Sequence, residues 1–392
     1  MNESTKAHGL DGTLVEPDWP PLTLGEVRAV LAKMPEVGEP VEILSTSPRP
    51  FSAASVVGTK RGKAFVKRHA RSVRDAEGLM EEHRFMQHLR KNGVEVPRVL
   101  TTDTGETAIE VGDWTYEVHD IPAGIDLYED AISWTPFRSV DHARSAGEML
   151  ARLHLAAESY DAPRRRPRPL VASFTIFASD NPFNAFEVYV SARPALLRDD
   201  STHRDFEEAL TLLQTFHEEL KPLLASLEPL WTHNDLHASN FFWSDTSPRA
   251  RAASVIDFGL ADRTTAVYDL AQAIERNVVD WLVLMRDANG GEDVSVHLDD
   301  LWALLDGYER VRPLSRAEAN ALVPMLALCH AEFALTEADY FLGVLHSAEK
   351  ARIATRDYLV GHARWFSGPG RRKILDPLRQ WEKSRERLAV RA

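Results

Sequence analysis

The spacing of hydrophobic residues changes along the chain and divides it into two parts. Up to about residue 121, short runs of β-branched and other apolar residues are separated by glycine, proline or polar residues, which predicts strands. Beyond that point, apolar residues recur at helical spacing over longer segments. The pattern predicts an α+β protein with a small sheet-containing lobe at 22–121 and a larger, mainly helical lobe at 122–392.

The smaller lobe is predicted to contain two helices and a small sheet. Leu22–Met34 has helical spacing, and Thr23 with Glu26 three positions later is typical of a capping box. A charged, amphipathic helix is expected at Ser72–Lys91. We expect residues 1–21, which precede this lobe, to be flexible. The expected strands are Val41–Leu44, Ala53–Thr59, Lys63–Arg68, Pro97–Thr101, Thr107–Val111 and Thr115–Asp120.

The larger lobe contains, at 161–200, the part of the chain that is hardest to predict. Within it, the basic, proline-rich run at 163–169 is typical of a solvated, mobile loop. Helices are expected at 142–157 and 204–227. The composition of 370–392 predicts a basic helical tail, which either packs on the acidic body of the protein or mediates assembly.

Composition narrows the classes of function. The formal net charge of −13 argues against a general nucleic-acid or anionic-membrane binder, since both attract basic surfaces. The single cysteine, Cys329, rules out a disulfide framework and a Cys-rich zinc site, and its apolar surroundings predict that it is buried. Residues 1–12 lack the apolar core of a signal peptide, and no apolar stretch approaches the length of a membrane span. A cytoplasmic location is expected.

Two segments of the chain carry the candidate chemistry. Trp231–Phe242 places Asp235 and Asn240 five positions apart on a loop that runs into an apolar strand, and Val255–Gly259 ends a strand with Asp257-Phe-Gly. Phosphoryl transfer depends on positioning and electrostatic stabilisation. Asp235 would accept or orient the proton of an attacking hydroxyl, while the oxygens of Asn240 and Asp257 suit Mg²⁺. Each residue alone also fits a turn or a cap; together, in this order, they favour phosphoryl transfer.

These segments resemble the aminoglycoside phosphotransferase and type II homoserine kinase superfamily, whose members have a two-lobed, protein-kinase-like fold. Asn234 stands where protein kinases carry an arginine, and Tyr268-Asp269-Leu270-Ala271 follows Asp257 too closely to leave room for an activation loop. The segment Gly307–Glu318 is also similar to members of this group. The resemblance extends from about residue 22 to about residue 366.

The resemblance implies a smaller lobe of mostly antiparallel strands that binds ATP, with GTP not excluded, and Mg²⁺. It implies that His233 and Asp269 support the catalytic loop, with Asp269 anchoring it from behind. In the alternating strand before the helix at 72–91, Lys67 would pair with the α/β-phosphates, although an exposed strand lysine is the alternative. By resemblance the helix supplies the partner carboxylate of Lys67, for which we expect Glu82 rather than its neighbour Glu81.

The resemblance also implies contacts with the nucleotide and the acceptor that the residue pattern alone does not predict. Ser52 lies in a glycine-free loop and would reach phosphate oxygens, but an ordinary hairpin loop explains that segment equally well. Backbone atoms near His119 and Ile121 would meet the adenine edge. Glu275 and Asn277 would contact an amine or hydroxyl of the acceptor, with surface caps or salt bridges as the alternative.

The sequence therefore predicts an ATP- and Mg²⁺-dependent kinase that transfers the γ-phosphoryl group to a hydroxyl of a small metabolite or antibiotic, such as an amino alcohol, amino sugar or sugar. One alternative is a Ser/Thr protein kinase like the bacterial stress-response kinase, which also lacks a long activation loop. Another is a non-catalytic, nucleotide-binding partner protein. No nucleic-acid or membrane partner is expected, and the sequence leaves the acceptor and the oligomeric state open.

Overall fold

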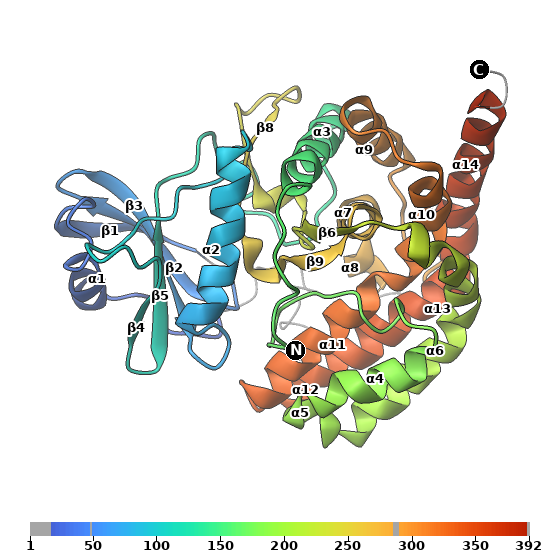
Figure 1. Cartoon of the computed structure of the whole chain (residues 1–392), viewed down its shortest axis with the longest axis horizontal. Helices are drawn as coiled ribbons and strands as arrows, with labels where there is room; N and C mark the ends of the chain where they lie inside the picture. Colours follow the sequence, from blue (N-terminus) through green and yellow to red (C-terminus); the bar gives the residue numbers. More distant parts are fainter. Residues whose placement is uncertain (1–16, 48, 285–289, 390–392) are drawn as a thin grey trace. The chain divides into compact units, whose positions relative to one another are not determined.

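The computed structural model describes residues 17–47, 49–284 and 290–389. It contains two compact units (Figure 1). The first runs to Ile132 and also takes in 241–246 and 252–259; the second comprises the rest. The first unit is therefore larger than the lobe expected at 22–121, because it continues past residue 121 and includes a hairpin and the Asp257-Phe-Gly segment from far along the chain.

A five-stranded antiparallel sheet with the order β1-β2-β3-β5-β4 forms the body of the first unit. Segment 97–101, expected to be a strand, contributes only an isolated bridge between Val99 and His119. The elements of this unit are α1 (Leu24–Leu31), β1 (Pro40–Thr46), β2 (Ala53–Thr59), β3 (Gly62–Ala70), α2 (Ala76–Lys91), β4 (Ile109–Val111), β5 (Trp114–His119), and the hairpin β7 (Phe241–Trp243) and β8 (Ala252–Val255), with the 3-10 turn η4 (Phe258–Leu260) after it.

The first turn of α1 makes the capping contacts that its sequence predicts. Thr23 Oγ1 accepts a hydrogen bond from the backbone N–H of Glu26 at 3.2 Å, and the Glu26 carboxylate accepts one from the N–H of Thr23 at 2.9 Å. This confirms the predicted capping box. Just before it, Asp18 N donates to Pro50 O at 3.0 Å and the rings of Trp19 and Trp114 meet edge-on. Residues 17–21 thus have defined contacts, whereas 1–16 of the expected flexible segment lie outside the described residues.

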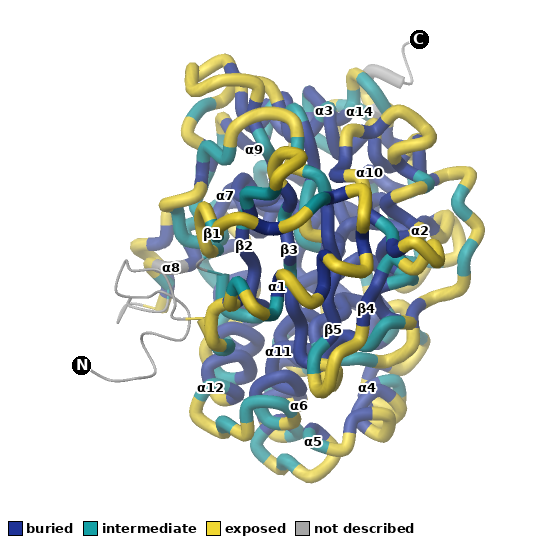
Figure 2. The backbone as a smooth tube through the Cα atoms, turned by 90° about the vertical axis from the view of Figure 1, so that its left-hand side faces the viewer, coloured by how far each residue is buried: buried dark blue, intermediate teal, exposed yellow. Residues whose placement is uncertain are grey.

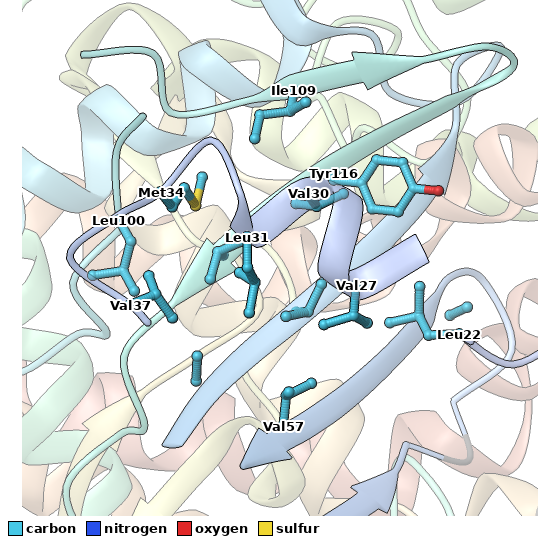
Figure 3. Close-up of a cluster of buried hydrophobic side chains, with 14 residues drawn as sticks. Leu22, Val27, Val30, Leu31, Met34, Val37, Val57, Leu100, Ile109 and Tyr116 are labelled. Atoms are coloured by element: carbon cyan, nitrogen blue, oxygen red, sulfur yellow. The ribbon is translucent and has the colours of Figure 1, made fainter. Parts of the chain in front are cut away.

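The two faces of the sheet differ in chemistry because side chains alternate along β3 and β5. One face packs under α1 in an apolar cluster that includes Ala64, Val66, Tyr116 and Val118 (Figure 3). The register pairs Lys67 with Glu117 and Phe65 with His119, so the opposite face carries polar side chains. That polar face meets α2, whose His83 hydrogen-bonds to Glu117.

The second unit is mainly helical, with one short two-stranded sheet. Its elements are α3 (Val140–Ala157), α4 (Pro182–Ser191), α5 (Pro194–Leu197), α6 (Asp200–Leu220), η2 (Lys221–Ser226), β6 (Pro229–Thr232), η3 (Ala238–Asn240), β9 (Asp262–Thr265), α7 (Ala266–Val278), α8 (Trp281–Leu284), α9 (Leu298–Val311), α10 (Arg316–Leu328), α11 (His330–Gly343), α12 (Ala348–Arg352), η5 (Ile353–Val360), α13 (Gly361–Ser367), η6 (Arg371–Leu375) and α14 (Asp376–Ala389). β6 pairs with β9. Every residue of α7 is buried (Figure 2).

Two glycines let helices α3 and α9 approach each other closely. A Cβ atom added at Gly147 would lie 2.0 Å from the backbone oxygen of Leu304, and one added at Gly307 would lie 2.0 Å from that of Arg144. No side chain fits at either position. This contact keeps α3 beside α9, and α3 carries His154 toward the candidate site.

The structure corrects some expectations about the second unit and confirms others. Among the described residues, the helical stretch Arg316–Gly343 is long and apolar enough to cross a membrane, contrary to our expectation, but 94% of its most apolar window is buried in the fold. The basic run at 163–169 is mostly exposed, as expected, with the exception of Arg165, which is buried and whose backbone N–H donates to Asp262 at 2.8 Å. Cys329 is buried as predicted. In the basic tail, Arg379 of α14 pairs with Glu219 at 2.8 Å, so the tail packs on its own unit.

Candidate active site

Asp269 anchors the loop that follows β6 by binding its backbone. It lies in the first turn of α7, and its carboxylate accepts hydrogen bonds from the backbone N–H groups of His233 and Asn234, both at 2.8 Å. Asn234 is left-handed, with φ 62°, a conformation that Asn tolerates better than most residues. His154 Nε2 donates to the same carboxylate at 3.0 Å. The resemblance implied this anchor, and His154 is a further member of it.

Asp235 and Asn240 lie together on the anchored loop. The Nδ2 group of Asn240 donates to the backbone oxygen of Asp235 at 2.7 Å and to its Oδ2 at 3.3 Å. The side chain of Asp235 is 17% exposed, which leaves part of the carboxylate accessible. Because the amide nitrogen of Asn240 faces Asp235, its amide oxygen is the atom left to meet a cation.

Arg276 is a member of this site that the sequence did not reveal. Its Nη1 donates to Asp235 Oδ1, and its Nε donates to Gln272 at 3.1 Å. The guanidinium is buried and lies 4.3 Å from the ring centre of Phe333. Burial alone lowers the pKa of Arg276, but the carboxylate of Asp235 and other negative groups outweigh it, so the pKa lies above its usual value. Asp269, Gln272 and Arg276 lie on one polar stripe of α7, which by itself predicts a solvated helix face, whereas every residue of this helix is buried.

In the first unit, Lys67 contacts Asp257. β8 ends two residues earlier, and Asp257 is left-handed, with φ 61°. Lys67 Nζ lies 3.2 Å from Asp257 Oδ1. Burial alone lowers the pKa of Lys67, but the carboxylates around it, Asp257 foremost, outweigh this effect and raise the pKa above its usual value. The lysine is therefore a stable cation beside a carboxylate that is 42% exposed.

Glu82 pairs with Arg74 and not, as we expected, with Lys67. Arg74 Nε lies 2.8 Å from Glu82 Oε1, and both side chains are buried. The fork of the same guanidinium donates through Nη2 to the backbone oxygen of Gly259 at 2.6 Å. Glu82 therefore acts through Arg74 on the Asp257-Phe-Gly segment, and its carboxylate reaches Lys67 only as one of several charges that raise the lysine pKa.

The structure thus assembles two groups of the expected residues, Asp235 with Asn240 in the second unit and Lys67 with Asp257 in the first. Comparison of the chain with known proteins identifies the family to which it belongs. Residues 51–314 match the model of the phosphotransferase enzyme family. The chain belongs to this family.

Named relatives and solved structures agree with that assignment. A homoserine kinase of Brucella anthropi is 31% identical over 243 residues, and the match spans 62% of this chain and 62% of the length of that kinase. A microcompartment-associated aminopropanol kinase has a TM-score of 0.56 at 16% identity, covering 89% of this chain and 99% of its own. An amicoumacin kinase in complex with AMP-PNP and Ca²⁺ has a TM-score of 0.54 at 15% identity, covering 88% and 93%. At such identities the two structures show the fold alone, which is the predicted kinase-like α+β fold.

Family membership implies that three further residues contact the nucleotide. The structure shows where these residues lie and does not test that role. Ser52 lies just before β2 and is buried, and Ile121 lies two residues beyond β5 and is 37% exposed. The backbone of His119 pairs with Phe65 of β3. The nucleotide contacts of all three remain predictions. The imidazole of His119 has a further contact, since its Nε2 donates to Glu117 at 2.7 Å.

Glu275 and Asn277 have interior contacts and not the acceptor contacts that we expected. Asn277 accepts a hydrogen bond from Ala238 N at 2.8 Å and donates to Leu236 O at 2.9 Å, so it holds the loop that carries Asp235. Glu275 is buried, and its Oε1 accepts a hydrogen bond from the Tyr358 hydroxyl at 3.3 Å. Both side chains are 1% exposed, which leaves no surface for an acceptor.

Proposed function

We propose that this protein is an ATP- and Mg²⁺-dependent phosphotransferase that moves the γ-phosphoryl group of the nucleotide to a hydroxyl of a small molecule. The observation that carries the proposal is the anchored loop, on which Asp235 is accessible and held by Asn240. Family membership and the homoserine kinase relative support the same activity.

Asp235 receives the acceptor hydroxyl in this proposal. Its carboxylate orients the hydroxyl and accepts its proton as the phosphoryl group is transferred. Arg276 touches Asp235 from the buried side, so it acts as a positioning residue that fixes the direction of the carboxylate. Lys67 is a cation that suits the phosphates of the nucleotide.

The residue types also suit magnesium. Asn240 in the second unit offers an amide oxygen and Asp257 in the first offers a carboxylate, and Mg²⁺ prefers such hard oxygen ligands together with phosphate oxygens and water. When bound, the ion neutralises negative charge on the transferring phosphoryl group. The complex of the amicoumacin kinase with AMP-PNP and Ca²⁺ supports the use of a nucleotide and a divalent cation in this family.

The acceptor class follows from the relatives. One is a homoserine kinase, and the two structures are kinases of aminopropanol and amicoumacin. All three names point to small molecules that carry a hydroxyl group. Hydroxy amino acids are the first acceptors to test, since the homoserine kinase has the highest sequence identity of the three.

The test measures ATP consumption with Mg²⁺ across pools of hydroxy amino acids, amino alcohols, amino sugars and sugars, beside the Asp235→Asn variant. We expect turnover in one pool and a loss of kcat of about 10²–10⁴-fold in the variant, with nucleotide binding kept. The exposed Asp245, changed to Asn, is the matched control and should leave kcat unchanged.

Other outcomes would redirect the proposal. Label from γ-phosphate-labelled ATP on a protein acceptor, without turnover of any pool, would favour the protein-kinase alternative. Nucleotide binding with no transfer to any acceptor would favour a non-catalytic partner protein. Near-normal kcat in Asp235→Asn would remove Asp235 from its role.

A further inference from the structure

Three histidines converge on one buried glutamate inside the first unit. Glu117 Oε1 accepts a hydrogen bond from His69 Nε2 at 2.8 Å, and its Oε2 accepts one from His83 Nε2 at 2.8 Å and one from His119 Nε2 at 2.7 Å. All four residues are buried. We call them the Glu117 cluster. The proposed phosphoryl transfer uses none of the three imidazoles.

Rigid elements hold the Glu117 cluster. Glu117 and His119 are two residues apart on β5 and therefore point to the same face of the sheet. His69 comes from β3, which is paired with β5, and His83 comes from α2, with its ring centre 5.7 Å from that of His119. A site built from strands and a helix keeps its donor atoms in position better than one built from loops.

The imidazole nitrogens and carboxylate oxygens of the Glu117 cluster are atoms of the kinds that bind metal ions. One ligand atom each of His83, Glu117 and His119 lies within 4.8 Å of the other two, the one such group of at least three among the described residues. We propose that these three side chains bind a divalent transition-metal ion of the Zn²⁺ class. Two imidazole nitrogens and one carboxylate oxygen are a set that Zn²⁺ and similar ions use, with a further position for water or another ligand.

His69 has a separate place in the proposed site. It holds the other carboxylate oxygen, Oε1, at 2.8 Å, and so fixes the orientation of Glu117. Such outer hydrogen bonds tune the affinity of metal sites. Mg²⁺ prefers oxygen ligands and near-octahedral geometry, so the nitrogen-rich cluster distinguishes a Zn²⁺-type ion from the Mg²⁺ of the proposed reaction.

Metal binding requires a change of tautomer in the cluster. Without a metal, the Nε2 atoms of His83 and His119 donate N–H hydrogen bonds to Glu117 Oε2. To ligate an ion through Nε2, each imidazole carries its proton on Nδ1 instead, because only an unprotonated nitrogen has a lone pair for the metal.

The test uses the full-length protein, stripped with a chelator and then equilibrated with Zn²⁺ in excess Mg²⁺. After gel filtration, elemental analysis should find one Zn²⁺ per chain. His83→Gln and Glu117→Gln should weaken binding by more than about 100-fold, and His69→Gln by about 10–100-fold. Two controls should bind as the unchanged protein does: His88→Gln, which alters a partly exposed histidine of the same helix, and Asp257→Asn, which alters the proposed magnesium ligand.

A second measurement covers variants that do not fold. His119→Cys replaces one ligand by another, and with Co²⁺ it should keep binding and add a thiolate-to-cobalt absorption band in the near ultraviolet. Absence of stoichiometric Zn²⁺ in the unchanged protein, equal Zn²⁺ in His83→Gln and Glu117→Gln, or a folded His119→Cys protein without the band would each overturn the proposal. The readouts need no turnover, so failure here is separate from failure of the proposed activity.

Discussion

Each unit contains a buried glutamate with histidines near it, and the two groups differ in which force dominates. In the Glu117 cluster, the interactions of the glutamate with the imidazoles, His119 foremost, outweigh burial and lower the pKa of the glutamate. The second group, which we call the Glu275 cluster, consists of Glu275, His330, Tyr358 and His362. There burial prevails: it raises the pKa of Glu275 and lowers that of His330 to about 3.

The difference lies in the number of donors and in the packing. The ring of His362 stacks on Trp281 with 3.6 Å between centres, and His330 lies among aromatic side chains. His362 Nδ1 lies 3.1 Å from Glu275 Oε1, but the rings of His362 and His330 pack mainly against aromatic side chains. In the Glu117 cluster all three imidazoles donate to the one carboxylate. Residue type and burial alone do not assign a role to a buried histidine; its hydrogen-bond partners do.

The glutamate of each cluster also interacts with a cationic residue of the candidate site. Glu117 faces Lys67 across the β3–β5 pair and contributes to the raised pKa of that lysine. Glu275 is adjacent in sequence to Arg276 and contributes to its raised pKa, after Asp235. The comparison can be tested at the glutamates, at the cations and by pH.

The largest effect on stability is expected from Glu117→Met, measured with a chelator present. The change leaves three buried imidazoles without their acceptor, so the free energy of unfolding should fall by about 3 kcal/mol or more. Glu275→Met is the matched variant and should lower it by at most about 1 kcal/mol, because burial already disfavours that carboxylate. Urea unfolding followed by circular dichroism measures both. Equal losses would show that the two clusters do not differ.

Lys67→Met should affect activity and not stability. Loss of one preorganised cation should lower kcat/KM for ATP by about 10²–10³-fold. Lys63, exposed on the same strand, provides the control, and Lys63→Met should leave kcat/KM unchanged. Steady-state kinetics with the acceptor found above, together with thermal unfolding of both variants, makes the distinction. A Lys67→Met protein with normal kcat/KM would remove the lysine from the nucleotide site.

Arg276→Lys probes the other cation. Lysine cannot reproduce the guanidinium fork that meets Asp235 and Gln272, so kcat should fall by about 10–100-fold, the equivalent of a charged hydrogen bond. KM for ATP should stay unchanged, since Arg276 contacts Asp235, the carboxylate that we propose for the acceptor hydroxyl. Arg310→Lys, on the exposed surface of α9, is the control. A rise in KM for ATP with normal kcat would contradict the positioning role.

The smallest effect concerns the Glu275 cluster at acid pH. Burial lowers the pKa of His330 to about 3, whereas an unfolded histidine titrates near 6.5. Below pH 6.5 the unfolded chain therefore binds a proton that the folded chain does not, and stability falls as the pH falls toward 3. From pH 7 to pH 5 this histidine should account for about 2 kcal/mol of the loss. Unfolding of His330→Phe at both pH values should show a correspondingly smaller loss; an unchanged loss would place the effect elsewhere.

Features set by neighbours in the chain could be predicted from the sequence. The capping box of Thr23 and Glu26 depends on residues three positions apart, and the two faces of β3 depend on alternation. Asp235 and Asn240 lie on one short loop, so their proximity follows from a separation of five positions. The anchor at Asp269 was available only through the resemblance to a family, because it joins segments 35 and 36 positions apart.

Choices among partners distant in the chain needed the tertiary structure. The resemblance to the family favoured Glu82 as the partner of Lys67. Only the structure shows that Arg74 pairs with the carboxylate of Glu82, and that Lys67 pairs with Asp257, 190 positions later in the chain. Asp269, Gln272 and Arg276 form a polar stripe on α7, but only the tertiary structure shows that this stripe is buried and that Arg276 donates to Asp235. His69, His83, Glu117 and His119 come from three separate elements, and only the pairing of β3 with β5 under α2 brings them to one point. Local spacing thus determined the elements and the catalytic loop, and long-range packing decided which charges meet.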